Sequence, residues 1–287
     1  MNRIVMRFPR GKSKALTLSY DDGVEQDIHL LELLEQYQVK ATFNLNSGLY
    51  PPEGTVYPQG TIHRRMPKSR VSELYRSPLA EVAAHAATHP FLDKLPPSQA
   101  MREILNDRTA LEKQFGCLVR GFAYPYGTYN DEVVEMLREA GICYARTVHS
   151  HHSFALPKDW LRLGATCHHD DPKLMELARQ FVSESSDRDP WLFYLWGHSY
   201  EFEAHDNWKV IEEFLDCVSG KKDIWYATNI EVYDYVKAYE RLIFSADGEM
   251  VQNPTAVPVW IAVYSVAGEE ACKVFCITPG DTVKLSF

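Results

Sequence analysis

The chain has 287 residues, of which 45% are hydrophobic and 24% are charged, a composition typical of one large globular α/β domain with or without a small appendage. Its net charge of -9 and its short basic runs argue against nucleic acid or an anionic membrane as the main partner. The six cysteines form no C-x-x-C pair, so we expect reduced thiols. Neither a secretory signal nor an apolar run long enough to span a membrane is visible, so we expect a cytoplasmic protein.

Apolar runs alternate with amphipathic segments along most of the chain. Helical spacing predicts helices over 27–37, 67–76, 98–115, 131–140, 174–184, 208–218 and 229–239. Short apolar runs predict strands over 15–20, 40–45, 81–85, 121–124, 143–147, 192–196 and 224–228. This alternation is typical of a largely parallel α/β sheet or barrel.

The pattern changes near the C-terminal end. Beyond residue 241 only short strand candidates occur, over 242–244, 259–264, 273–277 and 283–285. We therefore predict a barrel-like domain over 1–240 and a small β-strand appendage over 241–287, for which we favour a structural role.

Ionisable residues lie at or just after the ends of three predicted strands. Asp21 and Asp22 follow the first, His85 ends the third, and His198 comes two residues after the run that ends at Trp196. The carboxyl ends of parallel strands converge on one face, so these side chains are expected to be neighbours. Adjacent buried carboxylates stay ionised only if a cation or hydrogen-bond donors compensate them, so the pair predicts a metal.

A second histidine completes this predicted metal site. His85 and His89 are four residues apart, a spacing that places two imidazoles on the same side of a helical turn, where they can share one ion. Pro90 then discourages continuation of a helix.

Four segments together resemble the motifs of the polysaccharide deacetylases, carbohydrate esterase family 4, which contain the NodB-homology domain. These segments are Ser19–Gly23, His85–His89, Tyr124–Gly127 and Leu195–His198, and they occur in the family's order. The resemblance implies a distorted (β/α) barrel with fewer than eight regular strands, but it does not extend to the appendage. It also implies a metal-dependent hydrolase that removes acetyl groups from an N- or O-acetylated polysaccharide or oligosaccharide.

The resemblance assigns roles to individual residues. Asp22, His85 and His89 would bind one divalent metal, usually zinc, with cobalt or nickel as alternatives. Asp21 would be the general base that takes a proton from water, and His198 would be the general acid that protonates the leaving group.

The same resemblance implies the groups that contact the substrate. The backbone N–H of Tyr126 would stabilise the oxyanion together with the metal. The side chains expected to line the substrate site are those of Tyr126, Trp160 and Leu195. His168 is added to them from its place in a polar run after a strand-like segment, and not from the resemblance. Trp160 is equally well interpreted as a core residue.

The chain departs from the family pattern at two positions. The third motif usually carries an arginine that contacts the base, but Ala123 or its neighbour stands there. Arg162 and Arg146 are the candidates to replace it. Ala86 follows the first histidine where the family has serine or threonine, which puts the rigidity of that loop in doubt.

Several alternatives remain open from the sequence. The polar run Cys167–Asp171 is compatible with a second metal site or, through His168 or His169, with the lining of a substrate cleft. Within the Gly/Pro-rich stretch 46–66, the aromatic loop from Tyr50 to Tyr57, with His63 and Arg64, would either cover the cleft and stack on sugar faces or form an exposed connection. The alternative functions are hydrolysis of a cyclic imide or ureide and carbohydrate binding without catalysis. An acetylated carbohydrate is the expected partner, and a homo-oligomer remains open.

Overall fold

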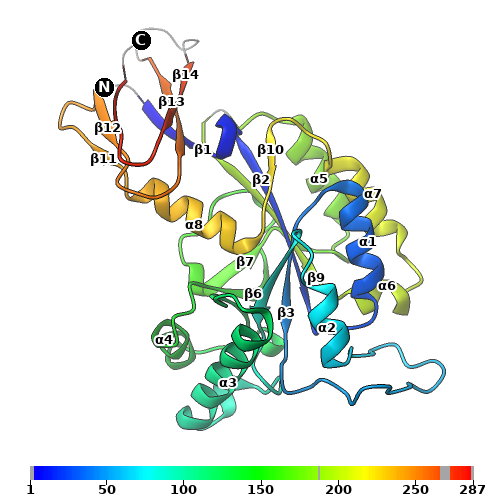
Figure 1. Ribbon diagram of the computed structural model, residues 1–287. Coiled ribbons are helices and arrows are strands. Elements are labelled where there is room, and N and C mark those ends of the chain that lie inside the picture. The colour runs from blue at the N-terminus through cyan, green and yellow to red at the C-terminus, as the bar shows by residue number, and fades with distance from the viewer. Residues whose placement is uncertain (1–2, 187, 266–271, 286–287) are drawn as a thin grey trace.

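A curled parallel sheet forms the centre of the computed structural model, which describes residues 3–186, 188–265 and 272–285 (Figure 1). All strand pairings in this sheet are parallel, and the strand order is β7-β6-β5-β4-β3-β2-β9-β8, with β10 beside β2. The strands are β2 (Lys14–Asp21), β3 (Ala41–Leu45), β4 (Ala80–Ala84), β5 (Gly121–Ala123), β6 (Tyr144–Ser150), β7 (Leu163–Ala165), β8 (Cys167–His168), β9 (Trp191–Gly197) and β10 (Ile224–Tyr226).

The sheet closes on itself at Thr166, the single residue between β7 and β8. The Thr166 N–H donates to the Tyr194 carbonyl of β9 at 2.8 Å, and the Thr166 carbonyl accepts from the His152 N–H, just past β6, at 3.0 Å. The two ends of the strand order are therefore one continuous segment. This closure confirms the predicted distorted barrel, with its short and irregular seventh and eighth strands.

Strand β2 lies in the middle of the sheet and is buried along all eight of its residues. It pairs with β9 on one edge, while its other edge is shared by β10 beside Lys14–Leu16 and by β3 beside Leu18–Asp21. A strand enclosed in this way must be almost continuously apolar, which explains the run from Ala15 to Leu18. The pairing places Asp21 at the carboxyl end of the strand, next to the ends of β3 and β9.

Helices cover the outside of the sheet (Figure 1). They are α1 (Asp27–Tyr37), α2 (Lys68–Leu74), α3 (Pro97–Phe115), α4 (Asp131–Glu139), α5 (Leu174–Ser183), α6 (Ser199–Ala204), α7 (Lys209–Val218) and α8 (Asn229–Glu240). The main core lies between them and the strands and includes fully buried Leu34, Phe43 and Phe193. Each such side chain contributes about 1.5–3 kcal/mol through removal from water. Among the described residues, no helix is both long and apolar enough to cross a membrane.

Two small antiparallel sheets form a separate unit next to α8 (Figure 1). They consist of β1 (Arg3–Arg7), β13 (Val259–Tyr264) and β14 (Cys272–Ile277), and of β11 (Ile243–Phe244), β12 (Met250–Gln252) and β15 (Thr282–Lys284). Ala238 and Leu242 join their apolar cluster. Because β1 leads into the amino end of β2, the unit lies at the end of the barrel away from Asp21. It also includes N-terminal residues, and the domain boundary at 240/241 remains a prediction.

A half-buried glutamate, Glu81, joins several elements at the amino end of the barrel. Glu81 accepts hydrogen bonds from the Tyr144 hydroxyl at 2.6 Å, the Thr42 hydroxyl at 2.8 Å and the Ile230 N–H at 2.9 Å. Gly121 lies against the Tyr144 ring, and a Cβ at Gly121 would be 2.1 Å from the Tyr144 Oη. Glycine at this position therefore lets Tyr144 reach Glu81.

We expect Gly121→Ala to lower the free energy of unfolding by about 1–3 kcal/mol, because overpacking displaces buried side chains. Urea denaturation measures this change. Tyr144→Phe alone should lower the free energy of unfolding by about 1 kcal/mol, because the hydrogen bond to Glu81 is lost. In the Gly121→Ala background the same change should lower it by less, because Gly121→Ala already breaks that bond. Unchanged stability of Gly121→Ala would contradict this account.

Candidate active site

Asp21 is a buried carboxylate at the end of β2 that is surrounded by donors. Its Oδ1 accepts from the Asn44 side-chain amide at 2.7 Å, and its Oδ2 accepts from Arg146. The Nε2 atoms of His85 and His198 each lie 3.7 Å from the same Oδ2. Burial by itself raises the pKa of Asp21, but Arg146, His85 and His198 together hold it below its usual value.

Arg146 fills the place of the missing motif arginine. Arg146 lies on β6 and pairs with Ala123 of β5, the position where the motif arginine was expected. Its side chain therefore extends from the neighbouring strand. Its side chain is 1% exposed, and its Cζ lies 4.2 Å from the centre of the Trp196 ring. Arg162 instead forms ion pairs with Asp131 and Asp159 at the surface. Of the two sequence candidates, Arg146 is therefore the one that contacts Asp21.

Asp22 faces a different environment from Asp21. Its φ of 82° is left-handed, which turns its side chain toward the stretch 46–66. Its Oδ2 lies 3.1 Å from the His63 Nε2, and its Oδ1 accepts from Arg65 at 2.8 Å. Burial opposes ionisation of Asp22, but His63, His85 and Arg65 keep its pKa low.

The end of the stretch 46–66 is fixed beside the site. The Glu25 N–H donates to the Arg64 carbonyl at 2.7 Å, and the Met66 N–H donates to the Gly23 carbonyl at 3.0 Å. Arg64 also binds both carboxylate oxygens of Glu203, at 2.8 and 2.9 Å. Residues 63–66 therefore lie beside the site, whereas residues 52–56 and 58–60 are exposed, as expected of a surface connection. That the aromatic part of the stretch covers a cleft remains a prediction.

His85, His89 and Asp22 offer ligand atoms that all lie within 4.8 Å of one another. The His85 Nδ1 lies 2.7 Å from the Ala123 carbonyl, which can only accept, so Nδ1 carries the proton and Nε2 has a free lone pair. This Nε2 is buried and has no hydrogen-bond partner. Burial lowers the pKa of His85, and burial together with His85 lowers that of His89 to about 4. Two neutral imidazoles and a carboxylate fit a divalent metal.

The backbone between His85 and His89 differs from the predicted helical turn. Residues 85–89 form a turn and not a helical turn, so that prediction is wrong. Ala86 and His89 both have left-handed φ values, 60° and 55°, and these reverse the chain. The His85 and His89 rings then lie 4.6 Å apart. Pro90 disfavours a helical conformation at His89, so the four-residue spacing of the two histidines does not produce a helix here.

Other groups hold this loop in place of the hydroxyl that Ala86 lacks. The Asn46 side chain donates to the carbonyls of His85 and Ala86 at 2.6 and 2.8 Å. Buried Asp107 accepts from the N–H groups of Ser47 and His85 at 2.7 and 2.9 Å. The loop is therefore anchored on both sides, and the doubt about its rigidity is removed.

His198 lies at the start of α6, next to a carboxylate partner. Its Nδ1 is 3.3 Å from the Glu201 Oε1, and its backbone N–H donates to the Glu201 Oε2 at 3.2 Å. Burial lowers the pKa of His198, but Glu201 and Asp21 outweigh burial and raise it. A histidine whose pKa is raised by neighbouring carboxylates and which faces Asp21 is suited to donate a proton.

The predicted substrate-contact residues divide into two groups. Tyr126 is 54% exposed, its ring lies 4.5 Å from His89 and it stacks on Phe91 at 3.9 Å. His168 lies beside the site, 6.4 Å from the His198 ring. Leu195 is fully buried in β9 and Trp160 packs on Tyr233 of α8, so both are core residues in this structure. Sequence reasoning assigned no role to Asn44 or Arg65, whose contacts with Asp21 and Asp22 join distant segments, and none to Trp196, although it lies within the fourth motif.

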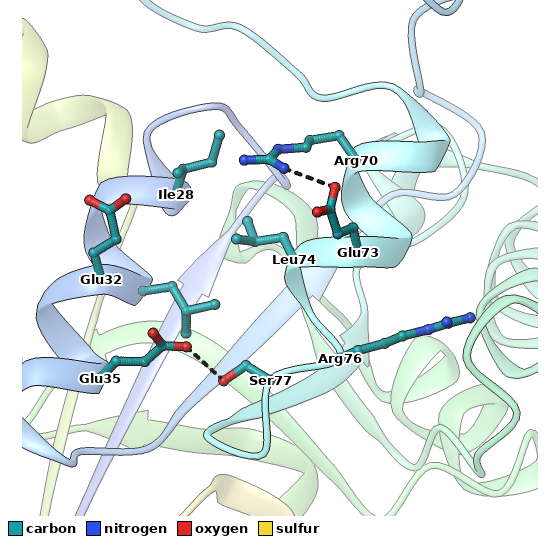
Figure 2. A pocket seen from close by; sticks show the side chains of 9 residues that line it. Ile28, Glu32, Glu35, Arg70, Glu73, Leu74, Arg76 and Ser77 are labelled. Atoms are coloured by element: carbon teal, nitrogen blue, oxygen red, sulfur yellow. Dashed lines mark hydrogen bonds and ion pairs between the residues drawn. The ribbon is translucent and has the colours of Figure 1, made fainter.

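A surface groove elsewhere on the barrel can be set aside. Figure 2 shows it between α1 and α2, with a volume of about 430 Å³. Its apolar floor includes Ile28 and Leu74, and Arg70 pairs with Glu73 at its rim at 2.8 Å. None of the predicted site residues lines it.

Comparisons with known proteins agree with the four motifs. Residues 9–145 match the family model of polysaccharide deacetylases. A chitooligosaccharide deacetylase of Bradyrhizobium sp. (strain ANU 289) is 30% identical over 155 residues, which is 53% of this chain and 61% of that protein. The chain thus matches less than two thirds of this relative's length. The resemblance predicted from the motifs is confirmed.

One solved structure shows the same fold as this chain. The structure of a Mycobacterium smegmatis protein assigned to the polysaccharide deacetylases matches with a TM-score of 0.57 and 17% identity, over 84% of this chain and 96% of that one. A family 4 carbohydrate esterase from Streptomyces lividans in complex with acetate has a TM-score of 0.47 and 17% identity, over 74% and 91%. The first of these matches establishes the shared fold.

We expect Arg146→Met to lower the free energy of unfolding by about 3–5 kcal/mol, because it leaves the Asp21 carboxylate buried without its cation. Arg162→Met is the matched control, and loss of its surface ion pairs should cost about 0–1 kcal/mol. Urea denaturation of the metal-free variants compares the two. Equal losses would contradict the assignment of Arg146 as the partner of Asp21.

Proposed function

We propose that this chain, which resembles the polysaccharide deacetylases, is a metal-dependent hydrolase that removes acetyl groups from N- or O-acetylated carbohydrate. The observation that carries the proposal is the arrangement around Asp21. A candidate metal ligand, His85, and a candidate acid, His198, approach the same carboxylate oxygen at 3.7 Å. A hydrolase needs a base, an acid and a polarising group around one reacting carbon; Asp21 and His198 would be the first two, and a metal held by His85 and its neighbours would be the third.

Asp22, His85 and His89 would hold the metal, for which we propose zinc. Three protein ligands leave an open coordination position, as in catalytic zinc sites. When bound there, a divalent cation polarises the acetyl carbonyl and lowers the pKa of water. Arg65 would hold the second oxygen of Asp22, at 2.8 Å, and so orient the first.

The protein's own groups then move the protons. Asp21, held ionised by Arg146 and Asn44, takes a proton from the attacking water. His198 gives a proton to the departing nitrogen or oxygen as the bond to the acetyl carbon breaks, which yields acetate and a free amine or alcohol. The Glu201 Oε1 lies 3.3 Å from the His198 Nδ1, and the opposite nitrogen, Nε2, faces the Asp21 Oδ2 at 3.7 Å.

Tyr126 supplies the remaining contacts of the proposed site. Its backbone, with a left-handed φ of 57°, would direct an N–H at the developing oxyanion. Its exposed ring, stacked on Phe91, offers a flat apolar surface beside His89. The name of the Bradyrhizobium relative suggests N-acetylated chitooligosaccharides as the first substrates to test.

We expect acetate release from N-acetylated chitooligosaccharides in the presence of zinc, and a decrease in kcat of about 10²–10⁴-fold in Asp21→Asn, because the amide cannot take a proton. Zinc binding should persist in this variant. Asp159→Asn, which changes an exposed carboxylate outside the site, should leave kcat unchanged. Unchanged acetate release in Asp21→Asn would exclude the proposed base.

We also expect a chelator to abolish acetate release and added zinc to restore it. His89→Ala should not recover at the same zinc concentration, because it lacks one of three ligands. Cobalt and nickel can be compared in the same assay. Activity that survives complete metal removal would contradict the proposal.

A substrate panel separates the proposed activity from its alternatives. Hydrolysis of cyclic imides or ureides without acetate release from any acetylated sugar would favour the other C–N bond hydrolase. Sugar binding without turnover in the zinc-loaded protein would favour a catalytically silent binding protein.

A further inference from the structure

A second group of histidines and carboxylates lies beside the candidate active site. It consists of His168, His169, Asp170 and Glu201, whose ligand atoms lie within 4.8 Å of one another. The first three follow β8 or end it, and Glu201 lies on α6. The proposed reaction uses only Glu201, through its Oε1, so the other oxygen and the other side chains have no assigned role.

His169 is the most unusual member of this group. Its side chain is 0% exposed, and neither ring nitrogen has a hydrogen-bond partner. The ring lies 4.1 Å from the Phe202 ring and is stacked on Tyr20 at 5.9 Å. A Cβ at Gly197 would be 2.1 Å from its Nδ1, so glycine is required there to admit the ring. Burying an imidazole without partners is costly unless something else binds it.

Two carboxylate oxygens lie close to the His169 Nε2 without a hydrogen bond to it. The Glu201 Oε2 is 3.1 Å away and the Asp170 Oδ1 is 3.5 Å away. Two ligands at about 2.0–2.1 Å from one tetrahedral cation lie about 3.3 Å apart. The observed separations therefore match those of atoms that share a metal ion.

The neighbouring histidines orient the two carboxylates. The His168 Nδ1 accepts from the Asp170 N–H at 3.1 Å, so its proton is on Nε2, which faces the Glu201 Oε2 at 3.3 Å. The His205 Nδ1 lies 3.3 Å from the Asp170 Oδ2. Both histidines therefore support ligands and are not needed as ligands themselves.

We propose that His169 Nε2, Asp170 Oδ1 and Glu201 Oε2 bind a second divalent first-row metal ion of the zinc type. One imidazole and two carboxylates form a set that such ions accept. A cavity of about 360 Å³ beside this group is lined in part by His169, Asp170 and His205. Through Glu201, whose Oε1 lies 3.3 Å from the His198 Nδ1, the ion would be connected to the proposed acid.

Metal stoichiometry tests the proposal without reference to acetate release. The full chain is saturated with zinc, freed of excess metal and measured by native mass spectrometry and elemental analysis. We expect two zinc ions per chain in the unchanged protein and one in His89→Ala. Asp170→Asn should weaken binding of one zinc ion at least about tenfold, because it replaces a charged ligand with an amide.

Control variants keep the outcome interpretable. His169→Ala should also lose one ion, and thermal unfolding of this variant shows whether it is folded. Asp170→Asn is the milder change, because it removes a partly exposed charge and leaves the buried His169 ring in place. His149→Ala, which changes an exposed histidine outside both groups, should keep two ions. One zinc ion in the unchanged protein that is lost in His89→Ala would overturn the proposal. So would a second ion that persists unweakened in both Asp170→Asn and His169→Ala.

Discussion

The buried ion pair between Asp21 and Arg146 is the constraint on which the rest of the site depends. The two residues lie on β2 and β6, which are four steps apart in the strand order. In a flat sheet those strands would be about 19 Å apart, beyond the reach of an arginine. The pair can form only because the sheet closes into a barrel. Closure of the barrel is therefore needed to keep Asp21 ionised, because burying this carboxylate without the Arg146 cation would destabilise the fold by several kcal/mol.

The same geometry separates two carboxylates that are adjacent in the chain. Asp21 is the last residue of β2 and points into the barrel, where Arg146 compensates its charge. Asp22 has a left-handed φ and points toward Arg65. Left-handed residues recur at Ala86, His89 and Tyr126, all beside the site. Such backbone strain persists only where the surrounding structure enforces it, and it is typical of functional sites.

Local patterns predicted most of the barrel, because buried strands and amphipathic helices have recognisable periods. The helix over 27–37 agrees residue by residue with α1. The patterns did not predict β1, which is a strand only because β13 pairs with it, or α6, which has only six residues. The helical turn over 85–89 was wrong because spacing alone does not specify φ. Contacts with Asn46 and Asp107 decide the shape of that loop.

By itself, the sequence determined the α/β class, the candidate ligands and the order of the motifs, because each depends on residue type and short-range spacing. It left two arginines as candidate partners for Asp21 and two interpretations of the polar run 167–171, a second metal site or the lining of a substrate cleft. Only the tertiary structure decided which arginine contacts Asp21, by bringing Arg146 across the barrel, and which carboxylate lies next to His169, namely that of Glu201. The physical reason is that both contacts join segments far apart in the chain, and closure of the sheet sets their distances.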